Sequence, residues 1–298
     1  MELRQLRYLL VITEEQNFTR AAERLFITQP ALTQQIQKLE QEVGSRLLDR
    51  SLRQIRLTPA GEILVHHARQ IMQELAEASI ALHELNGLQR GIITIGTVQT
   101  VNHYLLPTAL AEFANRYPAI QLRVEERSAD EIEAGVAEGH FQIGIAFVPA
   151  LDAELETELL FEEDLVLIVG MNHPLAVYKT LPVANLNGLP LVHFPTGFCT
   201  RRLWEAAQQQ AGIHTPISIE MNTVDGILST IQRSGMATIL PRLALHNTLS
   251  DAVRSIQLTD PTPRRGLGLL WRRGGYRCTA TQAFAEVLKS SIGYLLST

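Results

Sequence analysis

Apolar residues near the start of the chain recur every three or four positions, which is the spacing of amphipathic helices. The run FTRAAERLF (18–26) predicts one short helix, with Asn17 as its N-cap. The segment TQPALTQQIQKLE (28–40) predicts the next, with Thr28 as its cap and Pro30 in its first turn, where N–H groups lack intrahelical partners. Two short helices joined by a tight turn are typical of a helix-turn-helix, whose second helix can enter the major groove of DNA.

The second of these helices combines an apolar stripe with a polar, almost uncharged face. The stripe consists of Leu32, Ile36, Leu39 and Val43. The opposite face presents Gln29, Thr33, Gln34 and Gln37. A glutamine amide offers a donor and an acceptor that match adenine in the major groove, and threonine can bond a base edge or touch a thymine methyl. For one helix alone a solvated face is the simpler interpretation, but the neighbouring segments favour DNA recognition.

The next segment, LLDRSLRQIRLT (47–58), alternates apolar and polar residues and predicts a short strand or hairpin. Such a hairpin would be a wing beside the helix-turn-helix. It carries three arginines without an acid between them, which suit phosphate or minor-groove contacts. These arginines are Arg50, Arg53 and Arg56.

A long helix is predicted from Thr58 and Pro59, which form an N-cap and a first helical residue. Its apolar positions are separated by alternating steps of four and three residues. A helix that packs only on its own domain shows a broader stripe, so this seam favours a dimer coiled coil over packing within the domain. The seam consists of Leu64, Ala68, Ile71, Leu75, Ala78, Leu82 and Leu85.

From residue 91 onward the pattern changes to alternating strands and helices. This alternation implies right-handed crossovers and mostly parallel sheets, and about 200 residues favour two α/β lobes over one sheet. The expected strands are 92–96, 120–125, 143–147, 165–169, 237–240 and 266–271. The expected helices lie near 105–117, 130–138, 200–211, 224–234 and 280–296.

Composition and charge indicate where the protein is located and what kind of partner it binds. The chain of 298 residues has 46% hydrophobic and 19% charged residues, as an ordinary folded protein does. It lacks a signal-peptide core and an apolar run of membrane length, and two cysteines fit a reducing compartment, so we expect a cytoplasmic protein. The net charge is −5, yet residues 1–58 hold nine Lys/Arg against seven Asp/Glu. Local basic patches, rather than overall charge, contact phosphates.

Motifs for catalysis or metal binding are missing from the sequence. It has no GxGxxG motif and no Cys or His pair with zinc spacing, and His66 and His67 are adjacent on the long helix, where neighbours point apart. We therefore expect no enzyme activity, no metal and no cofactor beyond a non-covalent small molecule. A triad assembled from distant positions stays open at this point.

These residues together resemble the LysR-type transcriptional regulators. The resemblance covers the whole chain and is strongest in residues 1–61, where FTRAAERLFITQPALTQQIQKLEQEVGSRLLDRSLRQIRLTPAG carries the family's winged helix-turn-helix pattern. Leu48 is a departure, because the family often has an aromatic residue there, and we expect it to affect packing only. Looser motifs are YLLPTAL, EGxxxIG at 138–144, HPLA at 173–176 and GMATILP at 235–241.

The resemblance implies an α plus α/β fold in which a coiled-coil linker helix follows the DNA-binding domain. Two Rossmann-like α/β lobes, joined by two crossing strands, would resemble periplasmic binding proteins. We expect a DNA-binding domain at 1–58, a dimerisation helix at 59–89 and an effector-binding domain at 90–298. Within the last, lobe I covers about 90–161 and 268–298, and lobe II covers about 162–267.

The resemblance also implies partners. Family members bind interrupted palindromes in double-stranded DNA as dimers or tetramers and respond to a small inducer in the interlobe cleft, so we also expect RNA polymerase as a partner and no membrane. By similarity, the base- and groove-contacting positions are Gln29, Pro30, Thr33, Gln34 and Arg53. From the residue pattern we add Thr28, Gln37, Arg50 and Arg56.

An effector pocket is predicted where strands lead into helices, because ligands of open α/β folds lie beyond the carboxyl ends of strands. Plain N-capping is the alternative for each residue alone, but the family's inducer sites fall on these junctions, with Thr100 the best match. Helix N-termini and nearby Arg201 and Arg202 favour a carboxylate or an inorganic anion. The predicted lining residues are Gln99, Thr100, Ser128, Phe147, Thr196, Phe198, Thr200, Asn222 and Thr223.

Two further interpretations stay open. Cys199 stands where the family's peroxide-sensing member has its reactive cysteine, but Gln208 occupies the position of the resolving cysteine nine residues on. The rival from another class is an α/β solute-binding or enzymatic protein whose N-terminal domain only dimerises. Salt-dependent binding to a palindromic duplex separates this rival from a regulator.

Overall fold

The computed structural model describes residues 1–49, 55–84, 91–246 and 252–297. The chain separates into two compact units, Met1–Leu85 and Asn86–Thr298. Three predicted residues, Arg50, Arg53 and Leu85, lie outside the described residues. No helix of the described part is both long enough and apolar enough to cross a membrane.

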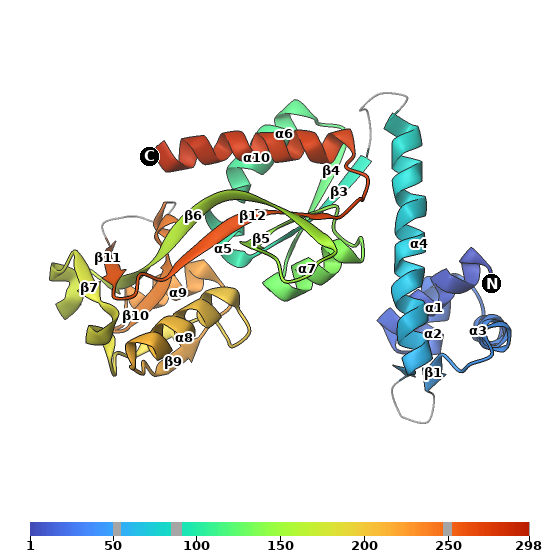
Figure 1. Ribbon diagram of the computed structural model, residues 1–298, viewed down its shortest axis with the longest axis horizontal. Coiled ribbons are helices and arrows are strands. Elements are labelled where there is room, and N and C mark those ends of the chain that lie inside the picture. The colour runs from blue at the N-terminus through green and yellow to red at the C-terminus, as the bar shows by residue number, and fades with distance from the viewer. Residues whose placement is uncertain (50–54, 85–90, 247–251, 298) are drawn as a thin grey trace. The chain divides into compact units, whose positions relative to one another are not determined.

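The first unit is a helix-turn-helix with a short two-stranded wing (Figure 1). Asn17 and Thr28 cap the second and third helices through their side chains, which confirms both predicted caps. Leu48 lies in the core and pairs with Leu57 across the wing. The elements are α1 (Leu3–Glu15), α2 (Phe18–Arg24), α3 (Gln29–Val43), β1 (Leu48–Asp49), β2 (Arg56–Leu57) and α4 (Pro59–Glu84).

Three apolar positions of this unit have an environment that the sequence pattern alone does not show. Val43 is 41% exposed, because α3 ends there and Gly44 turns the chain away in the left-handed conformation. Ala68 is fully buried and Leu64 packs on the core of its own unit, where α4 contacts α1. Ala68 of the predicted seam is therefore buried within its own domain, and Leu64 contributes to the same core.

The second unit contains two α/β lobes, each with its own core. Lobe I contains β3 (Gly91–Thr97), α5 (Gln99–Tyr104), α6 (Leu106–Arg116), β4 (Ile120–Glu126), α7 (Ala129–Ala137), β5 (Ile143–Val148) and α10 (Thr279–Ser297). Lobe II contains β7 (Thr180–Pro182), β8 (Leu191–His193), α8 (Cys199–Ala211), β9 (Ile217–Glu220), α9 (Val224–Ile231), β10 (Ala237–Pro241), β11 (Val253–Thr259) and the 3-10 helices η1 (Pro174–Val177), η2 (Val183–Leu186) and η3 (Arg242–Leu245).

Two long antiparallel strands, β6 (Leu155–Gly170) and β12 (Arg264–Arg272), cross from one lobe to the other (Figure 1). The strand order is β4-β3-β5-β12-β6-β10-β8-β9, with β11 paired to β6 and β7. Parallel pairs occur within each lobe, as β4-β3-β5 and β10-β8-β9, whereas every pairing of β6 or β12 is antiparallel. The expectation of mostly parallel sheets therefore holds only inside the lobes, because crossing strands must run in opposite directions.

Phe141 closes the core of lobe I where β3 and α7 approach each other. Phe141 is 3% exposed, and the Cδ2–Cε2 edge of its ring lies close to both Gly96 and Gly135. A Cβ at Gly96 would come within 2.6 Å of the ring, and a Cβ at Gly135 within 2.5 Å. Both positions therefore need glycine, and together they fix the helix beside the strand that leads to Thr100.

This packing predicts that Gly135→Ala lowers the melting temperature. Alanine favours a helix over glycine by about 1 kcal/mol, but overpacking a ring that cannot move costs about 1–3 kcal/mol. Gly293→Ala on α10 is the matched control, because nothing lies within 4 Å of the added Cβ, and it should leave the melting temperature equal or higher. Equal effects of the two substitutions in thermal unfolding would contradict the close contact.

Candidate functional site

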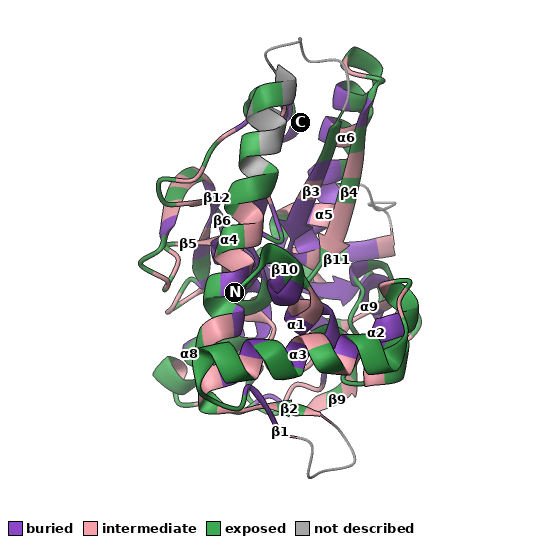
Figure 2. Ribbon diagram, turned by 90° about the vertical axis from the view of Figure 1, so that its right-hand side faces the viewer, coloured by how far each residue is buried: buried purple, intermediate pink, exposed green. Residues whose placement is uncertain are grey.

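The outer face of α3 carries the predicted amide row. Gln29, Pro30, Gln34 and Gln37 are exposed and Thr33 is half-buried, while the apolar side faces the core (Figure 2). The Gln29 amide donates to the Thr33 hydroxyl at 3.1 Å, which fixes these two side chains relative to each other. Thr28 is exposed, but its hydroxyl accepts the Ala31 N–H as the helix cap. The face therefore offers donors and acceptors without a charge.

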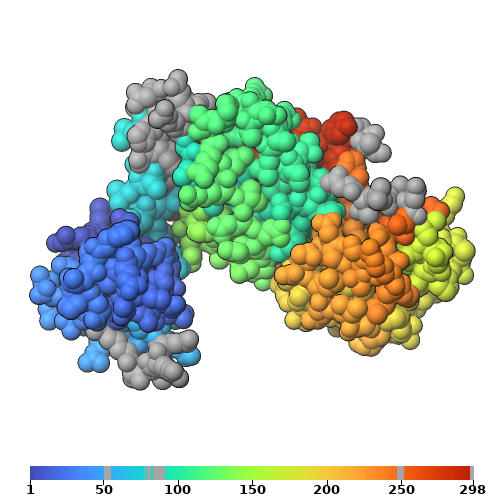
Figure 3. Space-filling model, turned by 180° about the vertical axis from the view of Figure 1, so that it is seen from behind, coloured from blue at the N-terminus to red at the C-terminus, as the bar shows by residue number. Residues whose placement is uncertain are grey.

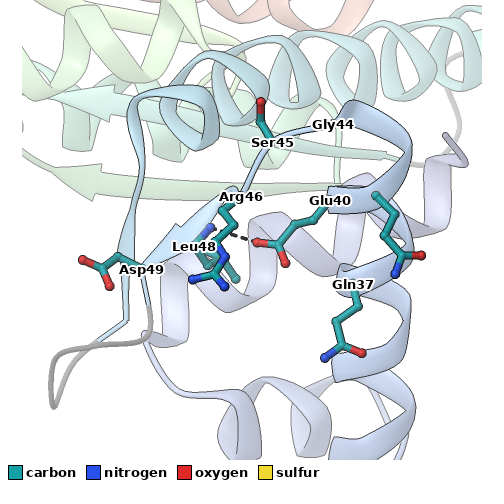
Figure 4. Close-up of a pocket in the computed structure, with 8 residues that line it drawn as sticks. Gln37, Glu40, Gly44, Ser45, Arg46, Leu48 and Asp49 are labelled. Carbon is teal, nitrogen blue, oxygen red and sulfur yellow. Dashed lines mark hydrogen bonds between the residues drawn. The ribbon is translucent and has the colours of Figure 1, made fainter.

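The acid near the end of α3 is engaged within the domain. An open hollow follows the end of this helix, lined in part by Gln37, Glu40 and Arg46 (Figure 4). Oε1 of Glu40 accepts the backbone N–H groups of Leu47 and Leu48 at 2.9 and 3.3 Å. The carboxylate keeps its charge and joins α3 to β1 through these two hydrogen bonds.

The wing and the long helix supply the other two predicted surfaces. Arg56 is exposed on β2, and the other two wing arginines lie outside the described residues. On α4, Ile71 is 37%, Leu75 44% and Leu82 66% exposed, and Ala78 is exposed as well. Between Ile71 and Leu82 the seam is therefore an exposed apolar stripe.

In the second unit, a cavity lies between the lobes, which Figure 3 shows as green and orange masses. It offers only about 10 Å³ to the centre of a water-sized sphere, which is room for about one water molecule. Six predicted residues line it: Gln99, Thr100, Ser128, Phe147, Phe198 and Thr200. Val98, Ala129, Phe194 and Cys199 complete the lining.

Three predicted residues lie elsewhere. Thr196, Asn222 and Thr223 are exposed and do not line the cavity, because their junctions reach the surface of lobe II beside it. Ser128 lines the cavity, but its hydroxyl donates to Glu131 at 2.6 Å in the capping box of α7, so it is engaged in helix capping.

A buried arginine lies behind the cavity and connects both lobes. Arg265 on β12 donates to the hydroxyls of Thr100 in lobe I and Thr200 in lobe II, both at 2.9 Å. Its Nε donates to Glu163 on β6 at 2.7 Å, and its guanidinium lies 4.4 Å from the ring centre of Phe147. Arginine carries its charge at any pH of interest, so the cleft has a permanent cation.

Sequence reasoning missed Arg265 and Glu163. The available signal was a pair of charged residues inside segments that otherwise read as buried strands, RRGLGLLW and FEEDLVLIV. Charged residues are almost never fully buried unless paired, so each implied a partner. The two are 102 residues apart, and the sequence pattern does not show that they meet.

Further bridges hold the lobes together around the cavity. Arg202 on α8 forms two hydrogen bonds of 2.8 Å to Asp130 on α7, and this guanidinium lowers the pKa of Asp130. His103 on α5 contacts the Ala244 carbonyl at 3.0 Å and Asp225 at 3.4 Å in lobe II. Phe194 and Phe198 stack with ring centres 5.2 Å apart. The cleft is thus in a closed arrangement.

Cys199, at the start of α8, has the features of an unreactive thiol. Burial raises its pKa, although the charges of Arg265 and Arg202 act in the opposite direction. The thiol therefore stays protonated near neutral pH, whereas the thiolate is the reactive form. Gln208, at the position of a resolving cysteine, accepts hydrogen bonds from the N–H and hydroxyl of Thr215.

Among the described residues, no group of three or more His, Cys, Asp or Glu side chains is placed to hold a metal ion. The first backbone N–H groups of α8 receive no side-chain cap, because Phe198 occupies the N-cap position. The cleft therefore offers a ligand the hydroxyls of Thr100 and Thr200, the Gln99 amide, a thiol, an aromatic wall and one guanidinium that is already paired.

Two family models match the chain. The model for the LysR substrate binding domain matches residues 86–292, and the model for bacterial regulatory helix-turn-helix proteins of the lysR family matches residues 3–62. Together they cover both units.

Relatives and solved structures are similar over nearly the full length. The "Probable RuBisCO transcriptional regulator" of Synechocystis sp. is 32% identical, over 96% of this chain and 85% of the relative. The dual regulator OxyR of Escherichia coli is 28% identical, over 97% of this chain and 95% of the relative. The structure of a full-length OxyR variant from Pseudomonas aeruginosa has a TM-score of 0.73 at 25% identity and covers 98% of this chain and 94% of that one.

The fold is also that of CbnR, with a TM-score of 0.68 at 24% identity over 98% of this chain and 99% of that one. These matches do not favour a solute-binding protein or an enzyme, because both units match models of one regulator family. The chain belongs to the LysR family and is a DNA-binding transcriptional regulator, not an enzyme.

Proposed function

We propose that this regulator binds a palindromic duplex site as a dimer or tetramer and responds to a small anionic inducer in the interlobe cleft. It acts in the cytoplasm with RNA polymerase as a partner, and it needs no cofactor besides the inducer. The observation that carries the proposal is the buried Arg265, which bonds a hydroxyl of each lobe at the closed cleft.

The amide face of α3 supports direct reading of bases. Gln34 and Gln37 are exposed on the helix that a helix-turn-helix places in the major groove, and a glutamine amide pairs with adenine there. The exposed wing residue Arg56 supports contact with the phosphate backbone of DNA. Such a contact positions the protein on the duplex but does not read the base sequence.

Replacing Gln34 with alanine tests the base contact. A site is first selected from a random duplex library with the wild-type protein, and affinity for it is then measured at fixed salt. Gln34→Ala should weaken specific binding by about 1–3 kcal/mol and leave binding to unrelated duplexes unchanged. Gln41→Ala, an exposed glutamine nearer the end of the same helix, is the control and should bind as the wild type does. If Gln34→Ala binds the selected site as tightly as the wild type does, Gln34 does not contact a base.

The exposed stripe on α4 supports dimerisation. Ile71, Leu75, Ala78 and Leu82 follow the steps of a heptad, and an apolar stripe at this spacing is buried by a second helix. Two recognition helices held by such a pair would reach half-sites about 34 Å apart, one helical turn of DNA.

Leu75→Glu should therefore shift the protein toward the monomer and weaken binding to the palindrome more than to a half-site. The reason is that a charge in the seam must be buried without a partner. Ala76 is exposed on a neighbouring face of α4, so Ala76→Glu is the control and should keep the oligomer mass of the wild type. Sedimentation velocity measures both, and an unchanged mass for Leu75→Glu would exclude the stripe as a dimer interface.

The closed cleft supports a ligand-controlled equilibrium. Arg265, Arg202 and His103 each connect the lobes, so the interlobe angle depends on these contacts. An anion that bonds Thr100, Thr200 and Arg265 differently in the open and closed arrangements shifts the population between them. In an oligomer such a shift changes the spacing of the DNA-binding domains.

A thermal-shift screen over small carboxylates and inorganic anions tests the inducer class. A ligand that binds the folded state raises the melting temperature, as RT ln(1 + [L]/Kd) requires. Thr100→Val should lower the affinity for a compound found in this screen roughly 2- to 10-fold, because it removes one hydrogen bond worth about 0.5–1.5 kcal/mol. Thr223→Val is the control, because Thr223 is exposed outside the cavity. Stabilisation by neutral compounds only would contradict an anionic inducer.

A further inference from the structure

The only buried ion pair that bridges the crossing strands in the described part of the chain is formed by Arg265 and Glu163. The two residues are register partners on β12 and β6, and their side chains are 5% and 4% exposed. Water is thus excluded from both charges, and the guanidinium and the carboxylate neutralise each other. A further charged group beside this pair would give the buried site a net charge, and water would not screen that charge.

The carboxylate uses its two oxygens unequally. Oε1 accepts from Nε of Arg265 at 2.7 Å, from Nη2 of the same guanidinium, and from the Tyr104 hydroxyl at 2.9 Å. Oε2 is buried and has no hydrogen-bond partner among the described residues. A guanidinium commonly binds both oxygens of a carboxylate with two parallel bonds, so this pair leaves one strong acceptor unused.

The arginines that flank the cleft in the described residues are already paired with acids. Arg201 donates to Glu205 at 2.6 Å, and Arg202 pairs with Asp130 at 2.8 Å, so in the described residues both flanking arginines are already neutralised. With Arg265 paired to Glu163, an anion bound to Thr100 and Thr200 would leave one uncompensated negative charge in a buried site. Such a charge is costly unless a group nearby becomes neutral.

We propose that the cleft binds its anionic effector together with one proton, which Oε2 of Glu163 takes up; this rests on the proposed function, in which the effector is an anion. The proton comes from solvent and forms an O–H bond on the unused oxygen. Oε1 keeps its hydrogen bonds from Tyr104 and Arg265, and the full charge of the guanidinium is then available to the anion. The bound site has the same net charge as the empty one.

Two other titratable groups near this pair, Tyr104 and Cys199, are poor sites for the proton. Burial first, and then the Glu163 charge, raises the pKa of Tyr104, which stays a neutral donor. Burial also raises the pKa of Cys199, which is already protonated at neutral pH. His103, next to Tyr104 on α5, contacts Ala244 and Asp225 of lobe II, and it is the rival acceptor that the experiment must separate.

Calorimetry with sodium formate as the probe measures the proton directly. Formate does not titrate between pH 6 and 8, and titrations in Tris and in imidazole give the number of protons taken up from the different ionisation enthalpies of the buffers. For the full-length wild type we expect about one proton per formate and about tenfold tighter binding for each unit by which the pH falls. This count on the wild type needs no variant.

Glu163→Gln tests the assignment. It should bind formate with no proton uptake, with an affinity that is independent of pH from 6 to 8 and at least tenfold above the wild type at pH 8. Glu162→Gln is the matched control, since Glu162 precedes it on the same strand with a side chain that is 58% exposed, and it should behave as the wild type does. His103→Gln should keep the proton uptake.

The outcomes separate this proposal from the one on which it rests. Formate binding to the wild type without proton uptake, or loss of uptake in His103→Gln but not in Glu163→Gln, overturns the role of Glu163 and leaves the anionic effector in place. No formate binding by either the wild type or a folded Glu163→Gln protein contradicts an anion site in this cleft altogether.

Discussion

The burial of one guanidinium organises the second unit. Arg265 lies on a strand that crosses both lobes, and a cation excluded from water must find acceptors close by. Thr100 provides one from lobe I, Thr200 provides one from lobe II, and Glu163 provides the opposite charge from the other crossing strand. Separating the lobes would remove a hydroxyl from a buried charge. The interlobe angle is therefore tied to whatever else can bond this guanidinium.

The DNA-binding unit was the more predictable part, because its signals are local. Asn17 and Thr28 cap helices within a few residues of themselves, and Leu32, Ile36 and Leu39 mark a buried face by their spacing alone. Long-range structure was harder. The first half of β6 contains ETELLFEED, whose charges hide a strand, and β9 has only four residues. Such segments become strands because neighbours far along the chain pair with them, which periodicity does not show.

Only part of the site could be predicted, because its residues meet through long-range contacts. The rule that ligands lie where strands lead into helices selected Thr100, Thr200 and Thr223 equally. It does not tell which junctions face each other, and only the crossing strands place the first two at one guanidinium while Thr223 stays exposed. Arg265 and Glu163 stood in strands that read as buried, where a charge without a visible partner was itself the evidence for a site.

The long helix α4 is packed into the DNA-binding core at its start and is exposed farther along. Its first turns are part of the DNA-binding core, since Ala68 is fully buried and Leu64 packs beside it, whereas the stripe from Ile71 onward is uncovered. A rigid helix rises 1.5 Å per residue and has little freedom to bend without proline or an interruption. Any partner on the exposed stripe thus fixes the direction of α3 through the same helix. If two copies pair through this stripe, as proposed, the spacing of their recognition helices depends on that pairing. A change in the pairing would then reach the DNA without any change inside the DNA-binding core.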